Sequence, residues 1–297
     1  MSLKELEEKA IARLRAFEPH KDDLPYYIAY SGGKDSDTVR ILAELSGVRY
    51  ELHHNLTTVD APETVYYVRS IPDIIIHRPE KSMWQLIPEK LMPPTRMIRY
   101  CCSELKERGG QGRRVVTGVR MAESVKRKRN GGMVKFLQKQ KATIRKAEEL
   151  GVDIQITSQG GIILNNDNTE SRELVEHCSM QAKVLINPIY DWTDSDVWEF
   201  LRHYGCKSNP LYECGFKRIG CIGCPMSGKH RYTDFRLYPK YKDNYLRAFQ
   251  KMIDARKTKR LHDKINWDTP ENVFKWWMGE DLDQLTFDDI FKLEGEE

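Results

Sequence analysis

Ser31-Gly32-Gly33-Lys34-Asp35-Ser36 is the stretch of this 297-residue sequence that decides the fold. It follows the apolar run 25–30 (PYYIAY), which predicts a short buried strand, and it precedes a segment of helical spacing that ends near Leu45. A glycine-rich turn between a strand and a helix binds phosphate in parallel α/β sheets, because backbone N–H groups and the positive helix end stabilise an anion. The spacings of a Walker A loop and of a dinucleotide fingerprint are both absent. The stretch therefore predicts an α/β domain with an anion site at its first turn.

The residue types of this loop suit phosphate in different ways. The two glycines let the backbone approach an anion closely, the two serines can donate hydroxyl hydrogen bonds, and the lysine brings a compact charge. The aspartate is a poor phosphate ligand, and we expect it to hold Mg²⁺ or to cap the helix. An ordinary glycine-containing turn is the alternative interpretation. The expected phosphate-binding residues are Ser31, Gly32, Gly33, Lys34, Asp35 and Ser36.

The alternation of strand and helix continues along the chain. Four further runs are predicted strands, at 48–56, 73–77, 114–119 and 184–189. A helix is expected over 193–204, begun by Thr193 or Asp194 and stopped by Gly205. Strands that alternate with helices pair in parallel, so we expect an α/β fold with a parallel five-stranded sheet flanked by helices.

Two regions depart from this alternation. Residues 126–165 begin as a basic segment that becomes helical and continue as a hairpin over 153–164, turning at Gly160-Gly161, so they predict an insertion. Residues 226–297 contain no clear strand but hold aromatic-rich helices, including 241–253 and 270–278. We therefore expect a nucleotide-binding domain over 1–225 and a helical C-terminal cap over 226–297.

The composition limits the class of protein. Hydrophobic residues make up 40% and charged residues 31%, which is typical of a soluble globular chain and not of disorder, collagen or a coiled coil. No uncharged run approaches the roughly 20 residues of a membrane span. The N-terminus has acidic residues where a signal peptide would be apolar, so a cytoplasmic location is expected. In such a chain, seven cysteines favour metal binding or catalysis over disulfides.

Four segments, in order, resemble one known family. The glycine loop is similar to the pyrophosphate loop of the adenine-nucleotide α-hydrolase (ATP pyrophosphatase) superfamily, and more narrowly the chain resembles the phosphoadenosine-phosphosulfate (PAPS) reductase family. The other segments are 59–64 (VDAPET), 118–127 (GVRMAESVKR) and 187–198 (NPIYDWTDSDVW). Any one of them is weak evidence and all four together are strong. The resemblance covers roughly residues 25–225 and implies the fold of that superfamily.

The resemblance also implies site residues beyond the loop. Guanidinium groups bind sulfate or phosphate through two parallel hydrogen bonds, which suits the 118–127 segment, although a solvated basic loop is the alternative. In the 187–198 segment we expect Trp192 to pack and Asp191 or Asp194 to cap the following helix. Lys34, Asp35 and Arg120 are the expected catalytic residues. The further nucleotide-binding residues are Asp60, Gly118, Arg120, Ser124 and Arg127.

The cysteines form two groups, Cys101-Cys102 and the later Cys214, Cys221 and Cys224. A C-x₂-C turn lets two thiolates face one ion, and distant cysteines complete four-fold coordination. The resemblance favours a [4Fe-4S] cluster, and Zn²⁺ is the alternative. The expected ligands are Cys102, Cys214, Cys221 and Cys224, with Cys101 as a substitute for Cys102 or a free thiol.

The chain departs from the reductases of the family at two points. They carry a nucleophilic cysteine in a C-terminal ECGLH tail, whereas no cysteine follows Cys224 here. They usually lose the SGGxDS loop, which is intact here and resembles the version that grips the pyrophosphate of ATP. We therefore expect an enzyme that uses ATP and Mg²⁺ to adenylate a substrate, and coupling to sulfur transfer at an iron–sulfur cluster is left open. The alternatives are a PAPS or adenylyl-sulfate reductase that releases sulfite, and a non-catalytic nucleotide-binding iron–sulfur partner in nucleic-acid modification.

The partners are less defined. Residues 126–146 hold nine basic residues and no acid, against a net charge of +4 for the chain. This concentration suits contact with tRNA or DNA, while a solvated helix is the alternative. The acceptor can be a small molecule or a nucleic acid, no membrane partner is expected, and a homodimer is left open.

Overall fold

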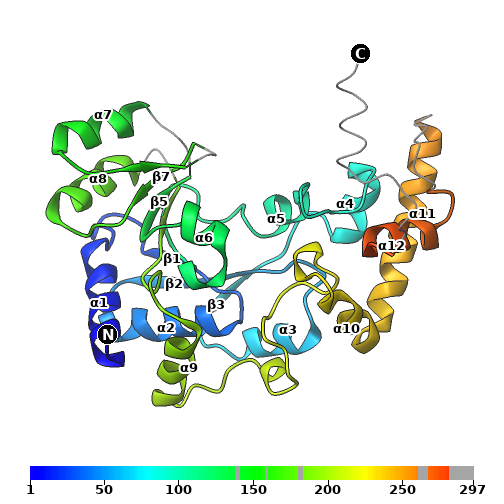
Figure 1. Ribbon diagram of the computed structural model, residues 1–297, viewed down its shortest axis with the longest axis horizontal. Helices are drawn as coiled ribbons and strands as arrows, with labels where there is room; N and C mark the ends of the chain where they lie inside the picture. The colour runs from blue at the N-terminus through cyan, green and yellow to red at the C-terminus, as the bar shows by residue number, and fades with distance from the viewer. Residues whose placement is uncertain (138–140, 158–159, 180–182, 260–266, 281–297) are drawn as a thin grey trace. The chain divides into compact units, whose positions relative to one another are not determined.

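The computed structural model describes residues 1–137, 141–157, 160–179, 183–259 and 267–280 (Figure 1). The chain divides into two compact units. The first, which we call the sheet unit, comprises 1–55, 62–77 and 108–219, and the second, the helical unit, comprises 56–61, 78–107 and 220–297. The helical unit thus combines the C-terminal region with two earlier segments, while the expected domain boundary after residue 225 stays a prediction. The frayed tail expected over 293–297 lies outside the described residues.

One eight-stranded sheet, in the order β3-β2-β1-β4-β8-β5-β7-β6, forms the centre of the sheet unit. The strands are β1 (Tyr26–Ala29), β2 (Tyr50–Asn55), β3 (Ile74–His77), β4 (Arg114–Val116), β5 (Val134–Phe136), β6 (Gln155–Ile156), β7 (Ile162–Leu164) and β8 (Val184–Ile186). The five strands expected from the sequence are neighbours and run parallel, with Ile28 paired to Leu52 and to Val116. The prediction of a five-stranded parallel sheet is wrong in its extent, because three further strands make the sheet mixed.

The three additional strands come from the insertion. β5 pairs antiparallel with β8, where Lys135 lies opposite Leu185, and β7 pairs antiparallel with β5. The hairpin expected over 153–164 is confirmed by the antiparallel pairing of β6 with β7. β5 was missed because it lies within the basic segment that was expected to become helical. The insertion therefore covers the edge of β8, whose backbone groups would otherwise lack partners.

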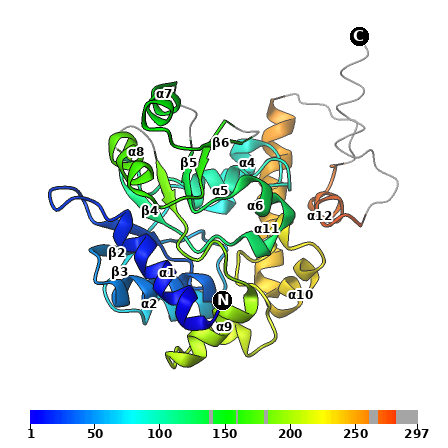
Figure 2. The same ribbon diagram turned by 60° about the vertical axis from the view of Figure 1, so that its left-hand side comes forward.

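Helices of the sheet unit pack in groups around the sheet. α1, α2 and α9 pack against one another, and α7 packs against α8 beside the antiparallel strands (Figures 1 and 2). Helix α1 begins with a capping box in which Ser2 and Glu5 bond reciprocally. The fully buried Trp192 is the largest side chain of the core. The helices are α1 (Leu3–Ala16), α2 (Lys34–Ser46), α3 (Pro62–Arg69), η1 (Met121–Glu123), α6 (Val125–Asn130), α7 (Lys141–Leu150), α8 (Thr169–Ser179), α9 (Asp194–His203) and η2 (Pro210–Tyr212).

The helical unit is built around aromatic residues. Helix α11 packs against α4 and α12, and the rings of Phe235, Tyr245 and Trp277 meet between them, with Tyr245 and Trp277 centroids 4.7 Å apart. These helices include both that were expected near the C-terminus, over 241–253 and 270–278. The elements are α4 (Met83–Lys90), α5 (Tyr100–Leu105), η3 (Pro225–Ser227), α10 (His230–Leu237), α11 (Pro239–Thr258) and α12 (Pro270–Met278).

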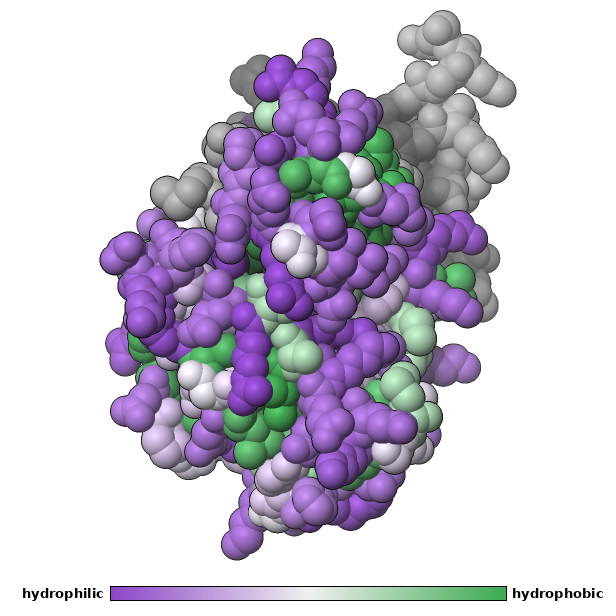
Figure 3. Space-filling view, turned by 90° about the vertical axis from the view of Figure 1, so that its left-hand side faces the viewer, coloured by the Kyte–Doolittle hydropathy of each residue, from purple (hydrophilic) through white to green (hydrophobic). Residues whose placement is uncertain are grey.

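Hydrophilic side chains predominate on the face shown in Figure 3, and hydrophobic ones gather there in small separate patches. Among the described residues, each helix is too short or too polar to cross a lipid bilayer.

Candidate functional site

The glycine loop connects β1 to α2, as expected from the sequence. Gly32 has a φ of +75°, and a Cβ there would lie 2.8 Å from Cγ2 of Val68, so this position requires glycine. Gly33 is the N-cap of α2, and its N–H donates to the hydroxyl of Ser36, which in turn donates to the Gly33 carbonyl. The first turn of α2 therefore begins the helix without the side-chain cap that would cover its N-terminal end.

Four charged residues meet beside this turn. Lys34 Nζ lies 3.3 Å from a carboxylate oxygen of Asp35 and 3.1 Å from one of Asp194. Arg120 bonds the same two carboxylates, at 2.6 Å through Nε and at 2.8 Å through a terminal nitrogen. Both cations are buried, at 5% and 2% exposure. We call Lys34, Asp35, Arg120 and Asp194 the ionic cluster; it places two buried positive charges at the end of the helix that favours anions.

The electrostatics of the cluster are balanced. Burial opposes the charge of Arg120, but Asp35 and Asp194 outweigh it and raise the pKa of the guanidinium. Partial burial also disfavours the charge of Asp194, yet hydrogen bonds from Arg120 and Lys34 lower the pKa of this carboxyl. Arg120 and Asp194 each favour the charged form of the other, and an incoming anion would compete with the two carboxylates for the two cations.

Gly118 allows the end of β4 to approach α2. A Cβ on Gly118 would lie 2.9 Å from the backbone carbonyl carbon and oxygen of Asp35. Because real Cβ atoms do not approach backbone atoms this closely, only glycine fits without moving the loop. Gly118 therefore keeps Arg120, two residues later, next to the first turn of α2.

The 187–198 segment positions the cluster, as the sequence suggested. The backbone carbonyl of Trp192 accepts a hydrogen bond from Arg120, and that of Tyr190 accepts one from the N–H of Met121. Asn187 is buried, accepts a hydrogen bond from the Thr117 hydroxyl and donates to Gly132. These bonds hold the turn that carries Arg120.

The expected capping role of Asp191 or Asp194 is wrong. Thr193 caps α9, and its hydroxyl accepts from the N–H of Asp196. Asp194 is instead the first residue of the helix and joins the ionic cluster, while Asp191 bonds Arg13 of α1 through both carboxylate oxygens. Thr193 lies directly before the first turn of α9 and its hydroxyl satisfies one free N–H group there, so Asp194 is left for an ion pair.

Tyr212 is a loop contact that sequence reasoning missed. The backbone N–H of Lys34 donates to its hydroxyl at 2.9 Å, and the same oxygen lies 3.2 Å from where a Cβ of Gly33 would be. Asn209 strengthens this contact by donating to the carbonyl of Gly32 and to the hydroxyl of Thr64. Tyr212 therefore occupies one of the N–H groups that a phosphate would use. Its only sequence signal was an aromatic residue beside Asn209-Pro210.

The remaining predicted nucleotide-site residues have other contacts. Ser124 caps α6 by accepting from the N–H of Arg127, and the guanidinium of Arg127 pairs with Glu123. Asp60 lies in the helical unit, where the backbone N–H and hydroxyl of Thr57 both bond its carboxylate at 2.7 Å. The described contacts thus bring together Lys34, Asp35 and Arg120, and they add Asp194 and Tyr212.

Acidic partners are present in the basic insertion. Arg145 and Lys146 both lie within ion-pair distance of Glu149, and Lys146 also approaches Glu173 of α8. Lys135 Nζ donates to the carbonyl of Asn130. Several of the nine basic residues are therefore engaged within the sheet unit. This arrangement favours a solvated helical face for that part of the segment.

Several cysteines come close together in the helical unit. Cys101 at the start of α5 interacts with Cys102, and also with Cys221 and Cys224. Its hydrogen bond to Cys102 raises the pKa of Cys101 and lowers that of Cys102. Cys221 pairs through its backbone with Asp60, and its thiol lies 3.5 Å from the hydroxyl of Thr57. The expected ligands Cys102, Cys214, Cys221 and Cys224 stay a prediction, and Cys101, their expected substitute, interacts with both cysteines of the C-x₂-C turn.

Lys106 interacts with these cysteines, and the sequence analysis did not anticipate this contact. Cys221 raises the pKa of Lys106, with Asp60 and Cys224 acting in the same direction. Cys214 lies in the sheet unit and is exposed. Cys206 is half-buried against the core, and the Cys178 side chain lies outside the described residues.

The sulfur donors of these cysteines suit a soft metal, but the positions of the described side chains do not form a metal site. Thiolates are the ligands of iron–sulfur clusters and of structural zinc. Within the described residues, however, no three Cys, His, Asp or Glu side chains converge at the distances of a metal site. The residues do not form an assembled centre, and we derive no chemical step through one.

Residues 25–227 match the phosphoadenosine phosphosulfate reductase domain, which is more than half of the chain. The chain belongs to this family. The matched residues include the glycine loop, the ionic cluster and the C-x₂-C turn.

One curated relative matches this reductase-domain chain over most of its length, and others match only a short segment of it. An uncharacterized protein of Methanocaldococcus jannaschii is 25% identical over 294 residues, which are 94% of the chain and 58% of that protein. The adenosine 5'-phosphosulfate reductase of Allochromatium vinosum is 46% identical over 39 residues, or 13% of the chain and 15% of that enzyme. The chain therefore spans less than two thirds of the length of these relatives.

Two solved structures that resemble this chain in fold have TM-scores below 0.5. The PAPS reductase of Candida auris has a TM-score of 0.41 at 16% identity, covering 74% of this chain and 93% of that one. A U34-tRNA thiolase of Methanococcus maripaludis, solved with its [4Fe-4S] cluster, has a TM-score of 0.37 at 10% identity, covering 88% of this chain and 82% of that one.

Proposed function

We propose that this reductase-domain chain is an enzyme that binds ATP at its glycine loop and transfers the adenylyl group to an acceptor. The observation that carries the proposal is the ionic cluster, in which buried Lys34 and Arg120 lie beside the N-terminus of α2. Buried cations are paired or serve an anion, and here the pairing carboxylates include Asp194, whose side chain is 65% exposed. An exposed partner can leave when an anion arrives.

Binding would exchange one set of contacts for another. The β- and γ-phosphates of ATP would accept hydrogen bonds from the N–H groups of the first turn, with the hydroxyls of Ser31 and Ser36 beside them. The N–H of Lys34 becomes available when the Tyr212 hydroxyl leaves it. Lys34 and Arg120 would move their bonds from carboxylate to phosphate oxygens, as their donors suit both.

The reaction is a displacement at the α-phosphorus. A nucleophilic oxygen of the acceptor forms a bond to that phosphorus, and the bond from the phosphorus to the oxygen bridging the α- and β-phosphates breaks. The proton of the acceptor goes to solvent, and pyrophosphate leaves with the electron pair. Charge accumulates on the pyrophosphate, where Lys34 and the amide groups of α2 stabilise it. Arg120 then orients the α-phosphate or the acceptor.

Mg²⁺ and an iron–sulfur cluster belong to the proposal as cofactors. Asp35, whose carboxylate is one quarter exposed, is the candidate Mg²⁺ ligand, and the metal would neutralise phosphate charge. For the cluster, the neighbouring Cys101, Cys221 and Cys224 are the candidate ligands within the helical unit, with Zn²⁺ as the alternative metal. Cys102 and Cys214 remain candidates from the sequence.

A parallel incubation tests the reaction. The full chain is supplied with ATP, adenylyl sulfate or PAPS, and pyrophosphate and sulfite are measured. We expect pyrophosphate from ATP and no sulfite. Lys34→Ala is expected to reduce pyrophosphate release at least 100-fold, whereas Lys4→Ala, at a lysine side chain 85% exposed, leaves it unchanged. Equal rates for the two variants contradict the assignment of the loop.

A reductase is the second candidate. The matched family favours it, and Cys214 is exposed in the sheet unit, where a thiol can reach a small substrate. Attack of that thiolate on the sulfur of PAPS would release adenosine bisphosphate and leave a thiosulfonate. A second thiol, from an external dithiol, would then release sulfite as a disulfide forms. Sulfite from PAPS that disappears in Cys214→Ser would support this candidate and contradict adenylation.

The third candidate is a nucleotide-binding partner without turnover in nucleic-acid modification. It predicts that calorimetry detects ATP binding while neither pyrophosphate nor sulfite appears.

The acceptor of the proposed adenylating enzyme is a small molecule or a nucleic acid, and contact of that enzyme with tRNA or DNA through 126–146 is part of the first proposal. A gel shift at low salt that weakens as salt rises would support that contact. A homodimer and a cytoplasmic location remain predictions.

A further inference from the structure

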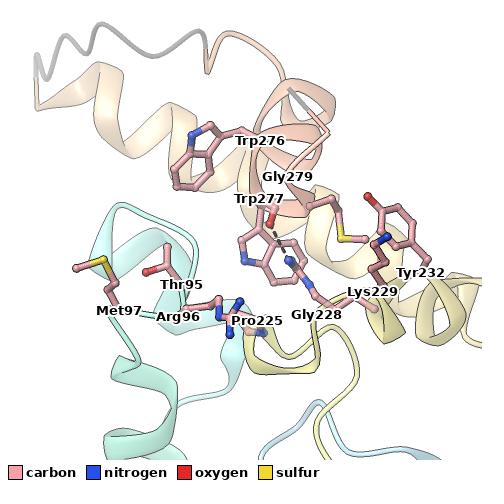
Figure 4. Close-up of a pocket in the computed structure, with 12 residues that line it drawn as sticks. Thr95, Arg96, Met97, Pro225, Gly228, Lys229, Tyr232, Trp276, Trp277 and Gly279 are labelled. Carbon is pink, nitrogen blue, oxygen red and sulfur yellow. Dashed lines mark hydrogen bonds between the residues drawn. The ribbon is translucent and has the colours of Figure 1, made fainter. Parts of the chain in front are cut away.

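A pocket lies within the helical unit. Three segments line it: the turn between α4 and α5, the start of α10, and the end of α12 (Figure 4). Its volume is about 490 Å³, within the roughly 300–1,000 Å³ of small-molecule sites. The charged residues that line it are Arg96, Lys229 and Arg231, and the lining contains no acid. The pocket is therefore positively charged.

Arg231 is the buried cation of this pocket. It is 6% exposed, and one terminal nitrogen donates to the backbone carbonyl of Trp277 at 2.7 Å. Its Nε and its other terminal nitrogen are buried without a partner among the described residues. Asp234, almost one turn further along α10, accepts from the N–H of Gly223 instead. Because these nitrogens are closed to solvent, Arg231 adds positive charge beside the pocket, and this charge favours an anion bound there.

The other two cations are at the pocket surface. Arg96 and Lys229 are exposed, and neither forms an ion pair with another described residue. They come from segments more than 100 residues apart in the chain. Figure 4 shows Arg96 beside Pro225 and Lys229 beside Tyr232. Cations on two sides of the opening would hold an anionic group between them.

Aromatic rings supply the rest of the lining. The Arg231 guanidinium lies 4.0 Å from the ring centroid of Trp277. Trp276 is half-buried and packs edge-on against Trp267, which fixes its orientation, while Tyr232 is 46% exposed. Flat rings beside arginine and lysine suit a ligand that combines a planar ring with an anion, because bases stack on aromatic and guanidinium planes.

We propose that this pocket binds one nucleotide, with its phosphate on Lys229 and Arg96, attracted also by the charge of Arg231, and its base against Tyr232 and Trp276. The nucleotide is either free or one residue of a single-stranded RNA, and both present the same phosphate and base. The pocket is separate from the glycine loop, since all of its residues lie in the helical unit. The proposal is therefore independent of the reaction at the loop.

Calorimetry on the full chain tests this proposal. The ligands are AMP, adenosine, inorganic phosphate and a four-nucleotide RNA, and each is titrated into the Lys34→Ala protein so that the glycine loop contributes little. We expect AMP to bind at least tenfold more tightly than either adenosine or phosphate alone. Tighter binding of the RNA than of AMP identifies a strand as the source, and equal binding identifies the free nucleotide.

Variants locate the binding. Arg96→Ala with Lys229→Ala removes two exposed cations without disturbing the core and should weaken AMP binding at least tenfold. Tyr232→Ala should weaken AMP binding but leave phosphate binding unchanged. Arg236→Ala with Lys251→Ala, two exposed cations outside the pocket lining, is the matched control. The proposal is overturned if AMP does not bind, if it binds no more tightly than phosphate, or if the pocket pair behaves like the control pair.

Discussion

At the scale of single residues, Tyr212 decides how the glycine loop meets an anion. Its hydroxyl accepts from the N–H of Lys34, and its ring packs edge-on against Trp198 at a centroid distance of 4.9 Å. Phosphate binding at the loop must break the first of these contacts. The ligand-free loop thus carries an internal competitor for its own anion site.

Tyr212→Phe is expected to tighten ATP binding about two- to tenfold, because the competing hydrogen bond of about 0.5–1.5 kcal/mol is removed while the ring packing stays. Titration calorimetry with ATP measures the change. Tyr66→Phe is the control, since Tyr66 is 71% exposed. Weaker binding in Tyr212→Phe would show instead that the hydroxyl contacts the bound nucleotide.

Asp37 is a second residue with an unusual environment. It is fully buried, Tyr30 and Tyr67 donate to one of its oxygens, and the other oxygen has no partner among the described residues. Burial raises the pKa of Asp37 from its ordinary 3.8 to about 6, despite the two hydrogen bonds. Between about pH 3.8 and pH 6, the folded state therefore holds a proton that the unfolded state releases.

A carboxyl with a raised pKa in the folded state loses its stabilising contribution as pH rises. The contribution of Asp37 is complete below about pH 3.8 and is lost as pH passes about 6, for a total of about 3 kcal/mol. Asp37→Asn should therefore flatten the fall in unfolding free energy between pH 4 and 7, measured by urea denaturation. The exposed Asp153→Asn should retain it. Parallel curves for all three proteins would contradict the assignment.

At the scale of elements, α1 is tied to the segment that carries the ionic cluster. Arg13 of α1 donates to both carboxylate oxygens of Asp191 and to the carbonyl of Pro188, and Lys9 also bonds Asp191 at 2.7 Å. Burial opposes the charge of Asp191, but these hydrogen bonds dominate and lower its pKa to about 2. An N-terminal helix thereby braces the turn that holds Trp192 and Arg120.

Asp191→Asn should destabilise the sheet unit by about 2 kcal/mol at pH 7, which follows from the difference between pKa values of 3.8 and about 2. A lowered carboxyl pKa stabilises the fold above pH 3.8, and this contribution is lost as pH falls through about 2. The difference between the two proteins should therefore shrink between pH 4 and 2. Thermal unfolding measures it, with the exposed Asp22→Asn as control. A difference that stays constant to pH 2 would exclude the ion pair as its cause.

At the scale of the whole molecule, the cysteines belong to different units. The helical unit contains Cys101, Cys102, Cys221 and Cys224, whereas Cys214 lies in the sheet unit. Cys221 follows Cys102 by 119 positions in the sequence. Folding of the helical unit, not sequence proximity, brings Cys101 to the later pair. A metal site built from Cys101, Cys221 and Cys224 would therefore form only once the helical unit has folded.

Protein purified without oxygen and reconstituted with iron and sulfide is expected to show visible charge-transfer absorbance. Cys221→Ser and Cys224→Ser should each lose it, while Cys206→Ser, at a cysteine packed against the sheet-unit core, should keep it. Colourless protein that contains stoichiometric zinc would replace the cluster by a zinc site. Colourless protein without metal would leave these cysteines as thiols.

The local pattern of residues was sufficient for the first turn and its surroundings. The apolar run before Ser31, the two glycines, and the capped helix after Thr193 each predict an element from residues that are adjacent in the chain, and all are confirmed. The five parallel strands followed for the same reason. β5 was missed because it lies within the basic segment whose pattern was interpreted as becoming helical.

The amino-acid order by itself determined the α/β class, the glycine loop and the family, because these depend on local spacing and on neighbouring residues. Only the tertiary structure decided that Asp194 joins Lys34 and Arg120, that Tyr212 covers an N–H of the loop, and that Arg231 lies buried beside Trp277. Each of these contacts joins residues at least 46 positions apart. Their energies depend on burial and on the distance between charges, which exist only once the chain has folded.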